Sequence, residues 1–137
     1  MGYVFDTSFI GSIILPDEKN LLVQRTYSAI AEDEKIFIPL LFWYEISNLF
    51  MNLVRRKRFT FNTVTGFYPA LAAIDLTIDS ESGIAYSRKL LQLCGDCNLS
   101  SYDAAYLELA QRKKAVLCTL DEGLRAAANN CGVTTLK

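Results

Sequence analysis

Histidine is absent from the 137-residue sequence, and this absence narrows the chemistry more than any residue that is present. Without imidazole, the chain has no Ser-His-Asp or Cys-His catalysis, no histidine-based acid/base ribonuclease chemistry and no histidine-ligated zinc. Any catalysis must therefore depend on carboxylates, lysines, hydroxyls or a bound metal ion.

Long apolar runs are also missing. The longest, IFIPLLFWY, ends at Glu45 and falls well short of the roughly 18 residues that a membrane-spanning helix needs. The chain starts without a basic segment and meets Asp6 early, so it lacks the pattern of a signal peptide. We therefore expect a soluble, cytoplasmic protein with no membrane contact.

Cysteine is scarce and unevenly spaced, which excludes a disulfide-rich secreted scaffold. The four residues are Cys94, Cys97, Cys118 and Cys131, and we expect them to be reduced. Cys94 and Cys97 form a C-x-x-C pair, but a zinc site needs two more ligands, and a redox motif opens a helix that follows a strand. The sequence therefore assigns this pair no role.

Proline and glycine are sparse as well, with 3 and 7 residues. Short β-branched or aromatic runs predict strands at 3–5, 36–38, 75–78, 115–119 and 133–135. Helices are expected at about 8–15, 18–32, 40–57, 61–73, 80–95, 101–113 and 121–130. This alternation predicts an α/β fold with a mainly parallel sheet of about five strands and helices on both faces. A hydrophobic content of 51% fits a single domain that spans residues 1–137.

Two aspartates follow predicted strands, at the edge where parallel sheets bind their ligands. Asp6 ends the first strand, and Asp121 comes two residues after the strand at 115–119. Helix capping is the alternative explanation for Asp6, because Asp, Ser and Thr are preferred caps. Thr119 and Glu122 have the spacing of a capping box, which would not need Asp121.

Two further acids lie inside predicted helices. Asp103 belongs to a capping pattern, in which a negative charge in the first turn is favoured in any case. Glu45 forms a narrow polar stripe with Asn48 and Asn52, beside an apolar stripe of Phe42, Ile46, Leu49, Phe50 and Leu53. Solvent exposure would explain this glutamate, yet its two aromatic neighbours leave little of the helix for water.

Four carboxylates gathered at one site would repel each other and shift each other's pKa unless cations neutralised them. Mg²⁺ and Mn²⁺ prefer carboxylate and water oxygens and need no histidine, in agreement with the composition. Such a site activates water and stabilises the charge that builds up during phosphodiester cleavage. Convergence of the four acids would therefore create a site for Mg²⁺ or Mn²⁺.

Four short stretches follow one another in a recognisable order. They are Asp6-Thr7-Ser8, PLLFWYEISN from Pro39, LSSYDAAYLELA from Leu99, and AVLCTLDEGL from Ala115. Together they resemble the PIN-domain family, specifically the VapC-type toxin ribonucleases of toxin-antitoxin modules. The resemblance covers nearly the whole chain and implies a three-layer α/β/α sandwich. It also implies a metal-dependent endoribonuclease, held inactive by a cognate antitoxin, that forms a homodimer.

The resemblance further implies roles for individual residues. The acidic site that holds Mg²⁺ or Mn²⁺ would consist of Asp6, Glu45, Asp103 and Asp121. The supporting positions are a hydroxyl that touches a metal-bound water or the phosphate, a hydroxyl from the fourth strand, and a polar residue near the site: Ser8, Thr119 and Asn48.

One region departs from the family pattern. Gly66 and Pro69 fall inside the helix expected at 61–73, which predicts that this helix is kinked, short or broken. In the family this region often contributes to the groove for the antitoxin peptide, and the alternative is that its rings pack the domain or a dimer. The aromatic residues concerned are Phe59, Phe61, Phe67 and Tyr68.

Seven of the fourteen basic residues lie in two runs, each at the end of a helix that carries one of these acids. The helix dipole favours cations there, which explains the run Arg112-Lys113-Lys114. Neutralising four acids would change the net charge from -1 to +3 and predicts salt-sensitive RNA binding. We assign RNA contact to the first run only: Arg55, Arg56, Lys57 and Arg58.

Three alternative functions stay open on the sequence alone. They are a PIN nuclease that is not a toxin, a catalytically silent PIN-fold module that binds RNA or protein, and an aspartyl-phosphate phosphoacceptor domain with Asp6 as nucleophile. The last is disfavoured, because phosphatases of that type need a second aspartate where Ser8 stands, and receiver domains need an acid pair after the first strand. No motif names the RNA target or the physiological metal.

Overall fold

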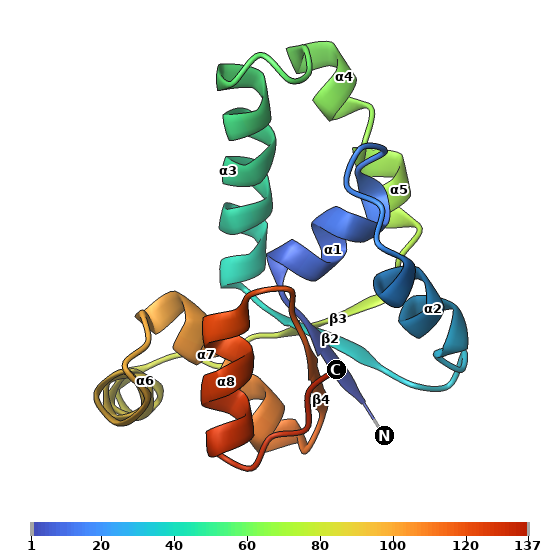
Figure 1. The fold of residues 1–137 in the computed structure, drawn as a ribbon. Helices are drawn as coiled ribbons and strands as arrows, with labels where there is room; N and C mark the ends of the chain where they lie inside the picture. The colour runs from blue at the N-terminus through green and yellow to red at the C-terminus, as the bar shows by residue number, and fades with distance from the viewer. Residues whose placement is uncertain (1, 137) are drawn as a thin grey trace.

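A parallel sheet of four strands forms the centre of the computed structural model, which describes residues 2–136 (Figure 1). The strands are β1 (Tyr3–Phe5), β2 (Ile36–Pro39), β3 (Leu76–Asp79) and β4 (Val116–Cys118). Their order is β3-β2-β1-β4, and each neighbouring pair is parallel. Since β1 lies between β2 and β4, Asp6, which directly follows β1, lies near the middle of the carboxyl edge of the sheet.

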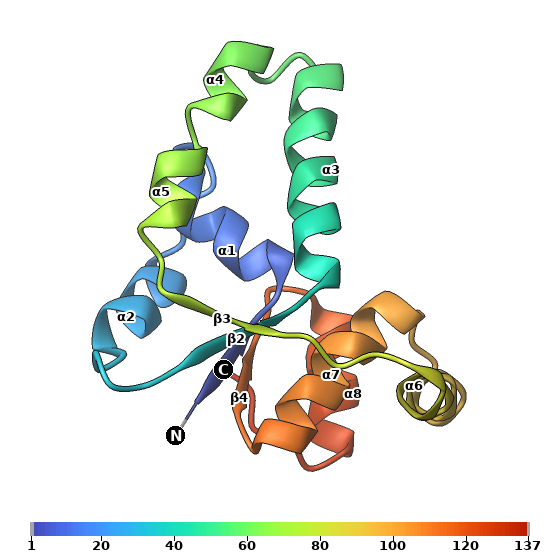
Figure 2. The ribbon, with the colours of Figure 1, turned by 180° about the vertical axis from the view of Figure 1, so that it is seen from behind.

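Helices connect the strands and cover both faces of the sheet (Figures 1 and 2). They are α1 (Thr7–Ile14), α2 (Leu21–Ala29), α3 (Leu41–Arg55), α4 (Phe61–Thr65), α5 (Tyr68–Ala72), α6 (Ile84–Cys97), α7 (Ser101–Lys113) and α8 (Glu122–Asn130). None of the helices between residues 2 and 136 is both long and apolar enough to cross a membrane.

Alternation along the strands divides the core into two clusters, one on each face of the sheet. Phe5 and Cys118 belong to a cluster with residues of α1 to α5, whereas Val4 and Leu117 belong to a second cluster with residues of α6, α7 and α8. Successive strand residues point to opposite faces, so one short strand supplies both clusters. The predicted α/β/α sandwich with a parallel sheet is therefore confirmed.

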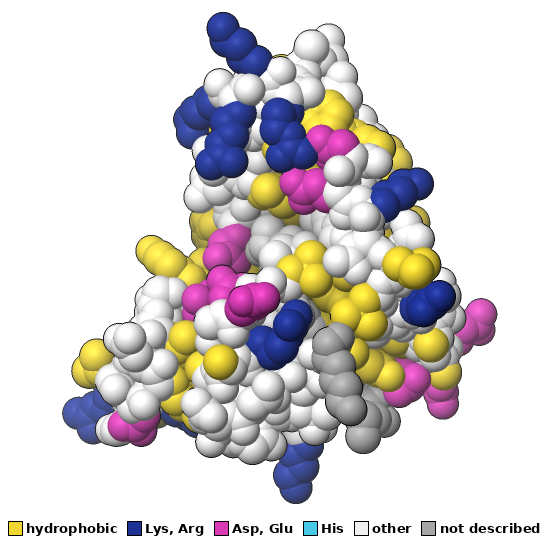
Figure 3. Space-filling model, viewed as in Figure 1, with side chains coloured by type: hydrophobic (Ala, Val, Ile, Leu, Met, Phe, Trp, Pro, Cys, Tyr) yellow, Lys and Arg dark blue, Asp and Glu magenta, His cyan; other side chains and the backbone are white. Residues whose placement is uncertain are grey.

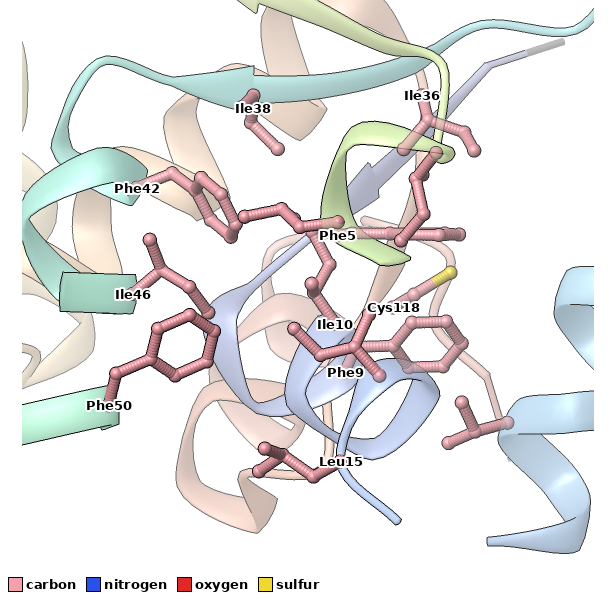
Figure 4. Packing of buried hydrophobic residues seen from close by; sticks show 14 of the residues in the cluster. Phe5, Phe9, Ile10, Leu15, Ile36, Ile38, Phe42, Ile46, Phe50 and Cys118 are labelled. Carbon is pink, nitrogen blue, oxygen red and sulfur yellow. The ribbon is translucent and has the colours of Figure 1, made fainter. Parts of the chain in front are cut away.

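The first cluster holds α1 and α3 against the sheet (Figure 4). The rings of Phe5 and Phe9 are 4.6 Å apart between centroids. Phe42, Ile46 and Phe50 face α1 from successive turns of α3, and all three are buried. This is the apolar stripe that helical spacing predicted, and it fixes the rotation of α3 that turns Glu45 toward the sheet edge.

The prediction of a strand at 133–135 was wrong. This segment makes one isolated bridge, between Leu117 and Thr135, and the sheet formed by the described residues has four strands rather than about five. Gly132, with φ of +75°, turns the chain after α8, and the backbone N–H of Val133 donates to the carbonyl of Ala128. Because that N–H closes the helix, it is not used in a sheet ladder.

The helix expected at 61–73 is broken, as its glycine and proline predicted. Gly66 follows the last residue of α4, and Pro69 lies in the first turn of α5. A proline costs little at that position, because the N–H it lacks would have no helical partner. The break turns the chain between α3 and the edge strand β3 (Figure 2).

Edge strand β3 is connected to the helical layer by a network of ion pairs. Arg112 of α7 donates to both oxygens of Asp79, with Nη1–Oδ1 and Nη2–Oδ2 distances of 2.9 and 2.7 Å. The same guanidinium contacts Glu108, whose carboxylate is almost fully buried. The Nζ of Lys89, on α6, lies 3.2 Å from Oε2 of Glu108. Burial alone would raise the pKa of Glu108, but its hydrogen bonds to Arg112 and Lys89 lower it. Hydrogen bonds from Arg112 also lower the pKa of Asp79.

We predict that Arg112→Met destabilises the protein by about 2 to 3 kcal/mol at pH 7, because it leaves the buried Glu108 carboxylate without its main partner. Since both acids have lowered pKa values in the folded state, this stabilisation is present above about pH 4 to 5 and is lost as pH falls. Urea unfolding at pH 7 and pH 3 tests both statements. Arg88→Met, on the exposed face of α6, is the control. A difference between wild type and Arg112→Met that does not shrink at pH 3 would contradict the electrostatic explanation.

Candidate active site

The four candidate acids belong to four different helices and lie at or near their amino ends. Asp6 caps α1, Glu45 lies in the second turn of α3, Asp103 lies in the first turn of α7, and Asp121 caps α8. The amino-terminal ends of α1 and α3 lie near α8 at the carboxyl edge of the sheet (Figure 1). Acidic side chains gather in this region of the surface (Figure 3). Helix amino ends favour negative charge, which reduces the cost of assembling several carboxylates.

Asp6 is the most constrained of these acids, with 6% of its surface exposed. Its Oδ1 accepts hydrogen bonds from the hydroxyl of Ser8 at 2.7 Å and the N–H of Phe9 at 3.0 Å, and its Oδ2 accepts one from Thr119. Burial raises its pKa, these bonds lower it in part, and the charge of Glu45 raises it further. Asp6 therefore caps α1 and also belongs to the acidic edge, as we call the part of the sheet's carboxyl edge that carries the candidate acids.

Thr119 and Ser8 connect the carboxyl ends of the neighbouring strands β1 and β4. The Thr119 hydroxyl donates to Asp6 and accepts from the N–H of Asp121 at 3.0 Å. The Ser8 hydroxyl donates to Asp6 and accepts from the N–H of Leu120 at 3.0 Å. Both hydroxyls thus use their donor and acceptor capacity, which holds the loop after β4 against the end of β1.

The expected capping box at the start of α8 was wrong. Asp121 itself caps the helix, because its Oδ1 accepts from the N–H of Leu124 at 2.9 Å. Thr119, two residues earlier, is buried and turned toward Asp6 instead. Local spacing suggested the box, but the contact across 113 residues determines where the threonine points.

Glu45 is held by two side chains to which the sequence assigned no role. Thr7 donates to its Oε1 at 3.1 Å, and the Tyr106 hydroxyl donates to the same atom at 2.5 Å. The two hydroxyls also contact each other at 3.2 Å. Burial and the hydrogen bond to Glu45 raise the pKa of Tyr106, so its hydroxyl remains protonated and donates to Glu45. Thr7 and Tyr106 both lie inside the quoted motifs, and that position was the only sequence signal for them.

Asp103 is partly exposed, and Asp121 is exposed. Both line a cavity of about 400 Å³ between the start of α7 and α8, together with Ser100 and Gly123. Burial raises the pKa of Asp103, and the charges of Asp121, Asp6 and Glu45 raise it further. Each of the three other acids therefore affects the pKa of Asp103.

The oxygen-rich donor set fits Mg²⁺ or Mn²⁺. Within residues 2–136, no three acidic or cysteine side chains are grouped closely enough to enclose a metal ion on their own. Mg²⁺ does not need such a cage, because it keeps several waters and is commonly bound through one or two carboxylates. Two carboxylates fixed by hydrogen bonds and two facing a cavity match that requirement.

The sequence matches the PIN domain family over residues 3–130. The chain belongs to the PIN domain family. PAE2754 from Pyrobaculum aerophilum is 20% identical and has a TM-score of 0.69, over 98% of this chain and 83% of that one. FitAcB from Neisseria gonorrhoeae is 13% identical with a TM-score of 0.69, over 98% and 96% of the two chains. VapBC2 from Rickettsia felis, bound to a DNA fragment from their promoter, is 13% identical with a TM-score of 0.71, over 99% and 98%. No curated protein matches.

Two other groups of predicted site residues lie farther along α3 of this PIN domain. Asn48 is exposed, about one turn after Glu45. The basic run Arg55 to Arg58 lies at the far end of α3, about 15 Å from Glu45 at 1.5 Å per residue. Basic side chains gather over that end of the helix (Figure 3). Arg58 is paired with Asp17 and Glu18, so part of the run is used within the chain.

We predict that Thr119→Val destabilises this PIN domain by about 1 to 3 kcal/mol, because the buried Asp6 carboxylate loses a donor. Thr119→Ser keeps the hydroxyl and should retain most of the stability. Urea unfolding of the three proteins at pH 7 measures the difference. A loss in Thr119→Ser with little loss in Thr119→Val would mean that the methyl group, rather than the hydrogen bond, supplies the stability.

Removing the charge of Asp103 should separate stability from metal binding. In EDTA we expect Asp103→Asn to be at least as stable as wild type at pH 7, because three other carboxylates disfavour its charge. In millimolar Mg²⁺ or Mn²⁺ we expect Tm of wild type to rise by a few degrees and that of the variant to rise less. Thermal unfolding measures both. Asp33→Asn, in the turn before β2, is a charge-matched control that should respond to metal like wild type.

Proposed function

We propose that this PIN domain is a metal-dependent endoribonuclease and the toxin component of a toxin-antitoxin module. One observation carries the proposal. Burial raises the pKa of Asp103, and the charges of Asp121, Asp6 and Glu45 raise it further. Carboxylates that disfavour each other's charge are typical of functional sites. An unfavourable cluster of this kind is explained if a divalent cation neutralises it.

Each residue has a distinct part in the proposed site. Mg²⁺ or Mn²⁺ held by the four acids would supply a bound water of lowered pKa and stabilise negative charge on the phosphate. Thr119 and Ser8 orient Asp6 through its two oxygens, and Tyr106 and Thr7 together orient Glu45. The cavity beside Asp103 provides space for a strand of RNA backbone.

The phosphoacceptor alternative is disfavoured by the surroundings of Asp6. A nucleophilic aspartate must present a free oxygen to the phosphorus atom, whereas both oxygens of Asp6 accept hydrogen bonds and the residue is buried. The metal-ligand role is compatible with these bonds, because ligating carboxylates are themselves usually hydrogen-bonded.

The partners follow from the same proposal. The motifs resemble those of VapC-type toxins, and the similar structures include VapBC2 of Rickettsia felis and FitAcB of Neisseria gonorrhoeae. These likenesses support a cognate antitoxin as protein partner, and we further propose that the chain forms a homodimer in the cytoplasm. Arg55, Arg56 and Lys57 are exposed and available for phosphate contacts, with Arg58 contributing less because of its ion pairs.

The decisive experiment is cleavage of structured RNA by purified protein in Mg²⁺, in Mn²⁺ and in EDTA. We expect cleavage that requires metal and falls by about a hundredfold or more in Asp103→Asn, because a charged ligand is lost while the side chain keeps its shape. Asp33→Asn should cleave like wild type.

Other outcomes would favour other conclusions. Equal cleavage by wild type and Asp103→Asn would point to a contaminating nuclease and contradict the assignment. RNA binding without cleavage, in every metal, would favour the silent binding module. Cleavage by a chain whose neighbouring gene encodes no antitoxin would favour a PIN nuclease that is not a toxin.

A further inference from the structure

Two cysteines that are far apart in the sequence lie side by side at the ends of two helices. Cys97 is the last residue of α6, and Cys131 directly follows α8. Their sulfur atoms are 3.1 Å apart, although 34 residues separate them in the chain. Both thiols are half-buried and pack against the second core cluster. The C-x-x-C spacing drew attention to Cys94, but the structure pairs Cys97 with Cys131 instead.

We propose that Cys97 and Cys131 are a reversible disulfide site, oxidised by a two-electron oxidant of the peroxide class, that joins the carboxyl ends of α6 and α8. Neither this pairing nor its test depends on nuclease activity. In compartments kept reducing by thiols, cysteine pairs of this kind form bonds transiently and act as redox sensors.

The geometry favours this pair over the other possible one on α6. A disulfide needs sulfurs about 2.0 Å apart, so Cys97 and Cys131 must approach by about 1 Å. Both are at helix ends, where the chain can shift, and Gly132 provides a turn next to Cys131. Cys94 and Cys97 are three residues apart within α6, where Cβ atoms are held about 5 to 6 Å apart. A disulfide needs about 3.8 Å between them, so that bond would require the helix to unwind.

Small oxidants can reach the pair from two sides. Cys97 lines the cavity of about 400 Å³ that also contains Asp103 and Asp121. Cys131 lines a second cavity of about 330 Å³. Cys118, in contrast, is fully buried in the first core cluster, and burial raises its pKa to about 12. We therefore expect Cys118 to remain a thiol when the pair is oxidised.

The chemistry balances with hydrogen peroxide as the oxidant. The reaction starts at one thiol of the pair, for example Cys131, and requires its thiolate form. Its thiolate attacks one peroxide oxygen, the O–O bond breaks, and a sulfenic acid and hydroxide form. The Cys97 sulfur then attacks the sulfenic sulfur and releases water. Two thiols lose two electrons and two protons, and the peroxide becomes two waters.

The bond would constrain the acidic edge. The chain between Cys97 and Cys131 contains α7, β4 and α8, and therefore Asp103, Thr119 and Asp121. The three residues after Cys97 lead directly to the start of α7, where Ser100 caps the helix by accepting from the N–H of Asp103. Fixing Cys97 to α8 therefore restricts the two walls of the cavity that these acids line.

The test uses the full chain, oxidised with a small excess of hydrogen peroxide and then alkylated. We expect two of the four thiols to be lost and peptide mapping without reductant to identify a Cys97–Cys131 cross-link. Tm should rise by about 5 to 15 °C, as for a bond that closes a loop of this length, and dithiothreitol should reverse both changes. Amide exchange should slow over residues 98–103.

Matched variants assign the effect to the pair. Cys94→Ser should still lose two thiols and gain stability, whereas Cys131→Ser should show neither change. A Cys94–Cys97 cross-link, bonds only between chains, or four thiols that survive oxidation would each overturn the proposal. Because wild-type peptide mapping decides the pairing, a variant that failed to fold would not obscure the result.

Discussion

The acidic edge depends on one buried carboxylate, that of Asp6. The residue ends the central strand, and burial opposes its charge. Three donors offset this cost, and they come from its own helix and from the end of β4. The same bonds therefore cap α1, connect β1 to β4 and hold Thr119 where it can fix the start of α8. Removing the carboxylate would release all three connections at once.

The partners of the buried carboxylates differ between this edge and the ion-pair network of Glu108. Farther along α7, Arg112 and Lys89 contact the buried Glu108, and its pKa falls despite burial. At the acidic edge, burial raises the pKa values of Asp6 and Asp103, and the charges of neighbouring carboxylates raise them further. Ion pairs thus stabilise the fold in one place, while the other retains carboxylates that a cation can neutralise.

Most of the fold could be predicted, because it follows from local patterns. Short β-branched or aromatic runs predicted the four strands, and the stripe from Phe42 to Leu53 predicted the buried face of α3. Gly66 and Pro69 marked the helix break, since both act through their own backbone. The failure at 133–135 has a different origin. Its residues are compatible with a strand, but the N–H of Val133 donates to Ala128 at the end of α8.

The sequence by itself determined the oxygen chemistry of this protein: no histidine, four candidate acids, and the PIN-like order of the motifs around them. The tertiary structure alone decided which groups hold those acids. Tyr106 reaches Glu45 across 61 residues, Thr119 turns to Asp6 across 113, and Cys97 meets Cys131 across 34. The spacing of residues along the sequence indicates which face of a helix or strand is apolar, but not which distant element packs against that face. These contacts arise only when the sheet brings the helix ends together.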